Sequence, residues 1–458
     1  MNRNVIAFVL AAALPLAHAA HAANPQLPER LFQAPAIANA YRPVLTAEER
    51  VAGLSLFWSE ARRNFVYFDH VPQLQWDQVY MDYLGKVIAA ATTEDYYRVM
   101  MTLAPLLQDS HTAIIPPAQM ARSLYGRPPV RTALIEDKVM VLHVGEADVA
   151  ARIKVGDEIV AIDGQPVRDY ARERIAPYVS ASTAQDRAER TFNYQLLPGD
   201  ADRPVALTLR AADGSERIET VARSGPGDAP PAAGFRQLDG EIAYIALDQF
   251  ENDADVQAFE AALPQILAAR GLVIDVRRNG GGSTLYALQV LSHLTRAPIK
   301  MMDAMTRNDD IVQRAQGRAR TDWTRVRGGA YSLPQKLVFE GPVAVLTSAR
   351  TISAAEDFTA MFKLMQRGIT VGETTGGSTG QPLVLGLPGG GSAFICIKRD
   401  MYADGSTFVG QGIAPDVEVK QTIAALRAGR DLALERAGAE LRKQLKGRSS
   451  EVASPPLR

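Results

Sequence analysis

The pattern of apolar and polar positions changes twice along this chain and so divides it into three regions. From Thr46 to about Gln108 apolar residues recur at helical spacing, which predicts a small helical bundle. Short β-like runs between turn signals follow, and they predict a β domain. Beyond Phe235, strongly apolar strands alternate with amphipathic helices, which is typical of a largely parallel sheet covered by helices. The predicted fold class is therefore α/β multidomain.

The two ends of the chain depart from this pattern. Arg3, an apolar run over residues 5–17 and the small residues after it are typical of a signal peptide. We therefore expect residues 1–22 to be removed on export to the periplasm or the exterior. The apolar run is too short to span a membrane comfortably. The other predicted regions are the helical region 46–112, the β domain 130–223, the α/β core 235–420, a C-terminal helix 421–445 and a disordered tail 446–458.

Composition argues against several classes of protein. The 458 residues carry a formal net charge of −1, so there is no electrostatic reason to expect a nucleic-acid partner. Cys396 is the only cysteine, so no intramolecular disulfide forms, and its place in an alternating run predicts a buried side chain. The scattered histidines do not make a metal-ligand cluster. Neither a metal nor another cofactor is predicted.

The stretch 350-RTISAAEDF-358 lies where an apolar strand gives way to a helix. Ser353 and Glu356 have the spacing of a capping box, and taken alone this spacing favours a structural cap. A helix N-terminus also presents free N–H groups, and a serine placed there can attack a carbonyl if a base is near. Ser353 therefore has two interpretations, as a helix cap and as a nucleophile.

Two further stretches are compatible with acyl-transfer chemistry. The glycines of 279-NGGG-282 follow an apolar strand, and the N–H groups of Gly281 and Ala354 form a candidate oxyanion hole. A lone run of glycines is also a common flexible turn. His111, in 109-DSHT-112, lies in a polar cluster at the end of the helical region, which suits a general base. A lone histidine is nevertheless more often structural.

The order of these stretches resembles the C-terminal-processing, or tail-specific, serine peptidases, together with their tricorn-like and retinoid-binding-protein-like relatives. The resemblance runs from about Ala47 to Val419. Its six pieces are 107-LQDSHT-112, the PDZ-like hairpin 152-RIKVGDEIVAIDGQPV-167, 275-DVRRNGGG-282, 350-RTISAAED-357, 372-GETTGG-377 and 410-GQGIAPD-416. The resemblance implies a crotonase-like ββα core, a PDZ-like β domain and peptidase chemistry with Ser353 as the nucleophile.

The family uses two kinds of base. In one arrangement a lysine follows G-E-x-T-x-G, but Ser378 occupies that position here. In the other, tricorn-like arrangement the base is a histidine from the N-terminal region that is preceded by a serine. Those positions are His111 and Ser110, so the resemblance implies that His111 is the base and that Ser110 helps to position it.

The tricorn-like arrangement also includes a glutamate shortly before the last motif, where this chain has Val409. Glu356 and Glu373 are the candidate carboxylate partners in its place, and Asp109 is a further one. Each of them also has a plain structural interpretation. The sequence therefore leaves the orientation of the catalytic groups open.

The implied substrate is a peptide or protein that adds along a strand edge of the core or of the PDZ-like domain, where a C-terminus can bind. Two alternatives stay open. One is a catalytically silent protein that uses the PDZ-like domain to bind C-terminal peptides. The other is a serine hydrolase acting on non-peptide esters or thioesters. The sequence does not give the oligomeric state.

Overall fold

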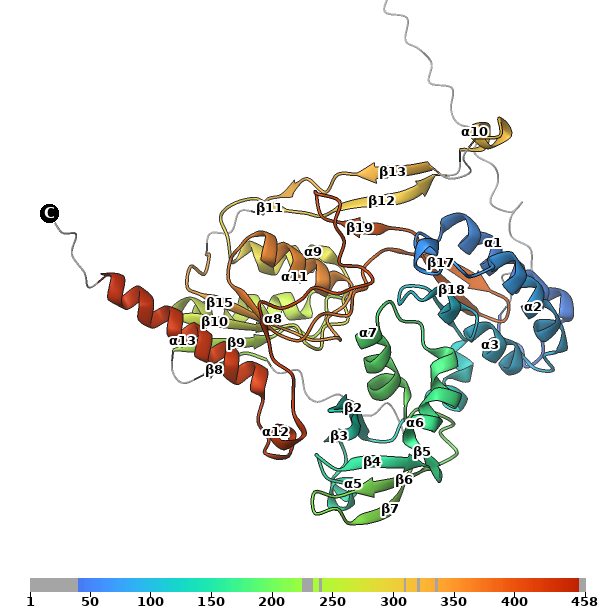
Figure 1. The fold of residues 1–458 in the computed structure, drawn as a ribbon, viewed down its shortest axis with the longest axis horizontal. Helices are drawn as coiled ribbons and strands as arrows, with labels where there is room; N and C mark the ends of the chain where they lie inside the picture. Colours follow the sequence, from blue (N-terminus) through green and yellow to red (C-terminus); the bar gives the residue numbers. More distant parts are fainter. Residues whose placement is uncertain are drawn as a thin grey trace, which may run out of the picture.

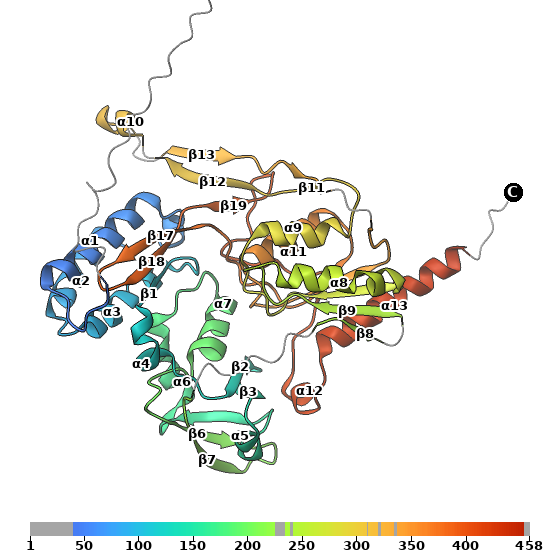
Figure 2. The ribbon, with the colours of Figure 1, turned by 180° about the vertical axis from the view of Figure 1, so that it is seen from behind.

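A computed structural model describes residues 40–224, 234–238, 241–308, 310–318, 322–333 and 337–452. Within these ranges the chain forms a helical N-terminal region, a β domain and an α/β core (Figures 1 and 2). The predicted mixed α/β, multidomain class is therefore confirmed, whereas the predicted signal peptide lies outside the described residues. No helix in the described part of the chain is both long and apolar enough to cross a membrane. The same residues hold no group of three or more potential metal ligands.

The N-terminal region contains three helices, of which the first and third pack on a small antiparallel sheet and the second packs on the other two. They are α1 (Ala47–Asn64), α2 (Trp76–Ala89) and α3 (Thr93–Met101), and the shorter helical turns are η2 (Phe68–His70), η3 (Ala104–Leu107), η4 (Ala118–Met120) and α4 (Ala121–Tyr125). The sheet has the order β1-β18-β17. Its strands are β1 (Ala113–Ile115), β17 (Pro382–Leu387) and β18 (Gly391–Cys396).

This sheet joins the N-terminal helices and a hairpin from much later in the sequence in one apolar core. Leu54, Phe57 and Tyr97 from the helices belong to the same cluster of buried side chains as Ala393 and Ile395 from β18. Cys396 lies in this cluster and is fully buried, as predicted. The helical region is thus completed by a hairpin that lies almost 300 residues further along the chain.

The β domain is an antiparallel sheet with helices at its side. The strands are β2 (Val130–Ile135), β3 (Lys138–Val144), β4 (Glu158–Ile162), β5 (Gln165–Pro166), β6 (Val205–Arg210) and β7 (Glu216–Val221). The helices are α5 (Ala147–Arg152), α6 (Val167–Tyr170), η5 (Ala171–Ile175), η6 (Ala176–Tyr178), α7 (Ala184–Glu189) and η7 (Arg190–Gln195). Asp163 and Gly164 both have positive φ and form the tight turn between β4 and β5 that their sequence favours.

The α/β core contains the predicted parallel sheet. Its order is β20-β16-β15-β10-β9-β8, with only the edge strand β8 antiparallel. The strands are β8 (Arg236–Leu238), β9 (Ile242–Ala246), β10 (Gly271–Asp275), β15 (Val343–Thr347), β16 (Ile369–Gly372) and β20 (Val417–Glu418). Helices α8 (Ala254–Ala268), α9 (Thr284–Ser292) and α11 (Ala354–Leu364) cover one face. Helix α13 (Leu432–Val452) packs on the other face.

The polar segment between α9 and β15, predicted to be an irregular lid or arm, is largely an antiparallel ribbon. It consists of β11 (Ile299–Lys300), β12 (Asp303–Asn308), α10 (Ile311–Ala315), β13 (Asp322–Val326) and β14 (Ala330–Tyr331). Strand β12 also pairs with β19 (Arg399–Met401). Figure 1 shows this arm reaching from the core across to the helical region.

The C-terminal helix differs from its prediction. It is divided into α12 (Ile423–Arg427) and α13, and α13 continues to Val452. The start of the predicted disordered tail at residue 446 was therefore wrong. Apolar side chains such as Ala437 and Leu441 pack on the sheet and give α13 a partner that local sequence does not reveal.

Candidate active site

Ser353 stands at a sharp turn between strand β15 and helix α11. Its backbone has φ 58° and ψ −131°, a conformation that costs a non-glycine residue about 1–3 kcal/mol and that is concentrated at functional sites. Its side chain makes no capping hydrogen bond to α11. The capping-box interpretation of Ser353 and Glu356 is therefore wrong, because both side chains have other partners.

The imidazole of His111 lies between two serine hydroxyls. Its Nε2 is 3.1 Å from Ser353 Oγ, and its Nδ1 is 2.8 Å from Ser378 Oγ. The small sheet explains this meeting, because β1 and β17 both pair antiparallel to β18 and so run in the same direction. The turn before β1 carries His111 and the loop before β17 carries Ser378. The two therefore come together at one end of the sheet.

Ser378 contacts both the candidate base and the candidate nucleophile. Its side chain is hydrogen-bonded to His111, and its carbonyl accepts the N–H of Ser353 at 2.7 Å. The residue is fully buried. In the sequence, Ser378 was noted only because it occupies the position of the lysine in the Ser-Lys arrangement. The family resemblance assigned no role to its hydroxyl.

Glu356 supports the loop that carries Ser378. Its carboxyl group is fully buried and accepts hydrogen bonds from the N–H groups of Gly377 at 2.8 Å and Ser378 at 2.6 Å, and from the Thr375 hydroxyl. Burial raises the pKa of Glu356 to about 8, although these three donors act in the opposite direction. Glu356 is therefore the candidate carboxylate that reaches the site, one residue removed from the imidazole.

The remaining carboxylate positions contribute less. Burial raises the pKa of Glu373, which lies beside the end of β16, although Lys420 and the backbone N–H of Gln421 act in the opposite direction. Val409 is buried in the apolar core of the helical region. Asp109 is buried and accepts the Thr112 hydroxyl at 2.7 Å, and burial raises its pKa to about 6.

Ser110 does not bond to the imidazole beside it. Within the described residues its hydroxyl donates to Asp186 and accepts the N–H of Ser182 at 3.0 Å, and both partners belong to the β domain. The predicted positioning of His111 by Ser110 would therefore act through the backbone of the turn, whereas Ser378 is the serine that contacts the imidazole directly. No motif in the sequence pointed to Ser182 or Asp186.

The two predicted oxyanion donors, the N–H groups of Ala354 and Gly281, differ in whether they already have an acceptor. Ala354 begins α11, and within the described residues its N–H has no hydrogen-bond acceptor. The N–H of Gly281 donates to Asn279 Oδ1 at 2.9 Å. Gly281 has φ 97°, and a Cβ there would lie 2.5 Å from the Ser353 Cβ, so only glycine allows this approach. Ala354 is thus ready to donate, whereas Gly281 has to release Asn279 first.

The half-buried His111 is surrounded by groups that oppose its charging. Burial is the largest cause, and Arg190 and Lys398 add two nearby positive charges, so that its pKa falls to about 4. A neutral imidazole with Nδ1–H directed to Ser378 leaves Nε2 free to accept the Ser353 proton. The environment therefore keeps His111 in the form that a general base requires.

We expect the rate at which a serine-reactive fluorophosphonate modifies Ser353 to fall only when the pH drops through about 4. The lowered pKa keeps His111 neutral above that value, whereas an ordinary imidazole is half charged near pH 6.5. The second-order rate constant measured from pH 3.5 to 8, with circular dichroism to verify folding, tests this. Arg190→Gln removes one positive charge and should move the acid limb to higher pH. An acid limb near pH 6.5 in the wild type contradicts the prediction.

Comparison with known proteins places this site in a family context. Residues 241–419 match the model of peptidase family S41, and residues 134–196 match the model described as Bacteroidetes, Peptidase, S41 family, N-terminal domain. The chloroplastic C-terminal processing peptidase of Tetradesmus obliquus is 25% identical over 273 residues, which are 59% of this chain and 53% of that protein. The carboxy-terminal-processing protease of Bartonella bacilliformis is 25% identical over 304 residues, which are 65% of this chain and 61% of that protein.

The chain thus spans little more than half the length of these curated relatives. Among solved structures, mature CPAF in complex with lactacystin has a TM-score of 0.67 and 14% sequence identity to this chain. The similarity covers 87% of this chain and 98% of that one. At this identity the likeness concerns the fold alone.

Proposed function

Because this chain belongs to peptidase family S41, we propose that it is an exported serine endopeptidase of the C-terminal-processing type, with Ser353 as nucleophile and His111 as general base. The observation that carries the proposal is the 3.1 Å distance between His111 Nε2 and Ser353 Oγ, which is within hydrogen-bond reach. The apolar segment in residues 5–17, behind Arg3, supports export to the periplasm or the exterior.

In the proposed mechanism His111 takes the proton of Ser353 through Nε2 while the serine oxygen attacks the scissile carbonyl. Ser378 Oγ accepts a hydrogen bond from Nδ1–H of the imidazole and so fixes the tautomer. The N–H of Ala354 holds the oxyanion first, and Gly281 joins it when the oxyanion replaces the Asn279 side chain as acceptor. His111 then protonates the leaving amine, and water hydrolyses the acyl-enzyme.

The arrangement fits a variant of the tricorn-like base rather than the Ser-Lys dyad. Within the described residues the side-chain amine of Lys363 pairs with Asp416, and that of Lys398 pairs with Asp400. Ser378 and the buried Glu356 together occupy the supporting position for which the expected glutamate is missing at Val409. We propose that Ser378 orients His111 and that a crotonase-like ββα core holds these residues in place.

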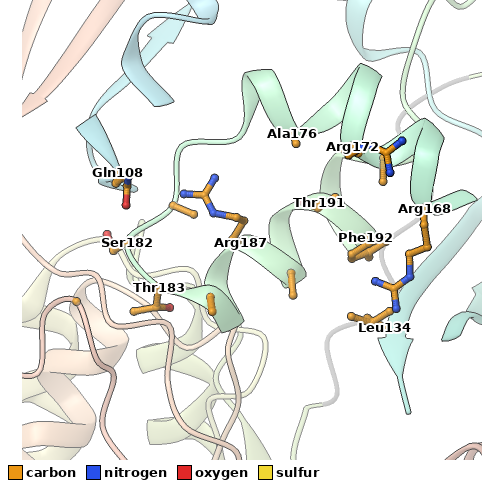
Figure 3. Close-up of a pocket in the computed structure, with 15 residues that line it drawn as sticks. Gln108, Leu134, Arg168, Arg172, Ala176, Ser182, Thr183, Arg187, Thr191 and Phe192 are labelled. Atoms are coloured by element: carbon orange, nitrogen blue, oxygen red, sulfur yellow. The ribbon is translucent and has the colours of Figure 1, made fainter. Parts of the chain in front are cut away.

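We propose that the β domain binds the substrate in the manner of a PDZ domain. A cavity of about 780 Å³ lies between β2, the helical segment α6–η5 and the segment α7–η7, and Arg168, Arg172 and Arg187 are among its lining residues (Figure 3). No carboxylate is among the described residues that line it. Arg168 and Arg172 pair with carboxylates beside the cavity, whereas Arg187 donates to the Val179 carbonyl, so Arg187 is the side chain whose charge suits a peptide tail with its free carboxylate. A cavity that binds a free C-terminus is what a peptidase of the C-terminal-processing type requires.

A fluorophosphonate probe tests the proposed chemistry. We expect covalent modification of Ser353 in the wild type, located by peptide mass spectrometry, together with cleavage of an unstructured protein substrate. Ser353→Ala should lose both. A wild-type protein that is folded, is not modified and binds peptides with a free C-terminus would establish the silent binder instead. Modification together with hydrolysis of esters but not of peptides would establish the ester hydrolase.

A further inference from the structure

A short segment of the β domain, residues 182–186, is hydrogen-bonded to the turn that carries His111, the candidate base. The N–H of Ser110 donates to Ser182 Oγ at 3.0 Å, and the N–H of Ser182 donates to Ser110 Oγ at 3.0 Å. The Ser110 hydroxyl also donates to Asp186, whose same oxygen lies 3.1 Å from the Ser182 N–H. The residue next to His111 is therefore held by a reciprocal pair of hydrogen bonds that Asp186 closes.

Asp186 is itself fixed from several sides. It is 2% exposed, and its other carboxylate oxygen accepts Nε of Arg190 at 2.7 Å. Thr183 caps α7 and accepts the Asp186 N–H at 3.2 Å. A buried carboxylate with this many partners presents its oxygen to Ser110 in a defined position.

The same segment also holds the loop that leads to Ser378. The Thr183 hydroxyl donates to the Gly376 carbonyl at 2.7 Å, and Gln185 Nε2 lies 3.0 Å from the Thr375 carbonyl. Figure 3 shows Ser182 and Thr183 beside Gln108, at one end of the cavity of the β domain. Residues 182–186 therefore contact both loops that meet at the imidazole.

The bonds that the His111 turn makes within its own region all run to one residue, Asp109. The turn follows Gln108, which has φ 50°. Asp109 accepts the Thr112 hydroxyl at 2.7 Å, the Thr112 N–H at 3.3 Å and the backbone N–H of His111. Strand β1 begins only at Ala113. A catalytic group has to be held within about 0.5 Å of its productive position, and a shift of about 1 Å can cost roughly 10²-fold in rate.

We propose that Asp186 is a positioning residue for the general base. It acts through Ser110 to hold the His111 turn, so the β domain forms a structural part of the active site as well as a place for peptide tails. This inference rests on the proposed function, because it assumes that His111 acts on Ser353. It also implies that moving α7 away from Ser110 disables the site by displacing His111, without substitution of a catalytic residue.

Asp186→Ala tests the proposal in the full-length protein. We expect kcat for a short fluorogenic peptide to fall about tenfold or more while KM stays within about twofold, since Asp186 is assigned no contact with substrate. Asp157→Ala is the matched control. Asp157 is also buried in the β domain, 4% exposed, and pairs with Arg217, but it lies outside the network that holds His111. Its kcat per folded molecule should equal that of the wild type.

A double-mutant comparison separates positioning from general destabilisation. Because Asp186 is proposed to act through Ser110, the variant Ser110→Ala/Asp186→Ala should be no slower than the slower single variant. Ser182→Ala, which removes only a hydroxyl, should lower kcat in the same direction and keeps the test open if Asp186→Ala does not fold.

Three results would overturn the proposal. They are an unchanged kcat in folded Asp186→Ala or Ser182→Ala, a loss that Asp157→Ala reproduces, and losses that multiply in the double variant. Activity that survives in Ser353→Ala would instead show that the proposed function itself has failed.

Discussion

Replacing His111 with alanine is expected to lower kcat for peptide hydrolysis by roughly 10³-fold or more, which is the scale of losing the base from a serine nucleophile. The Ser353 side chain also lies close to Gly281, but within the described residues only His111 Nε2 lies in position to take the proton of its hydroxyl. Lys398 does not provide a substitute base, because its amine is paired with Asp400. Steady-state kinetics and the rate of fluorophosphonate modification should fall together.

His143→Ala is the matched control for this variant. His143 lies on β3 of the β domain, and the proposed mechanism assigns it no part in catalysis. We expect its kcat to stay within about twofold of the wild type. If His111→Ala retained most of its activity while Ser353→Ala lost it, another group would have to be the base.

Much of the α/β core could be predicted, because its signals are local. An apolar strand followed by glycines and an apolar strand followed by Ser353 predict a parallel pair whose carboxyl ends meet at one edge. In the structure β10 and β15 are neighbours in parallel register, and Gly281 lies against Ser353. The spacing of polar and apolar residues is sufficient for this result because each strand and each helix N-terminus is specified by its own few residues.

The support of the base could not be predicted in the same way. The Ser353-x-x-Glu356 spacing is a real capping signal, but the Ser378 carbonyl takes the Ser353 N–H, and the loop before β17 takes the Glu356 carboxylate. Tertiary contacts thus override a local preference worth only about 1 kcal/mol. Ser182 and Asp186 form no motif, and they meet Ser110 more than 70 residues away in sequence.

Removing the hydroxyl of Ser378 is expected to lower kcat about 10²-fold. The imidazole of His111 would lose the only hydrogen bond to Nδ1 found within the described residues, and with it the preference for the tautomer that leaves Nε2 free. A misplacement of about 1 Å is enough to account for a loss of this size. The Ser378 carbonyl would still hold the Ser353 N–H, so the nucleophile should keep its position. KM should therefore change little, which separates orientation of the base from binding of substrate.

Ser292→Ala provides the comparison for Ser378→Ala. The Ser292 hydroxyl is similarly buried, on α9, and donates to the Gln289 carbonyl at 2.6 Å, so its loss should cost comparable stability without touching the imidazole. Thermal unfolding of both variants allows kcat to be expressed per folded molecule. Equal kcat in Ser378→Ala and Ser292→Ala would mean that the hydroxyl at position 378 does not orient the base. His111 would then have to be held by its own turn and by the grip of the β domain on Ser110.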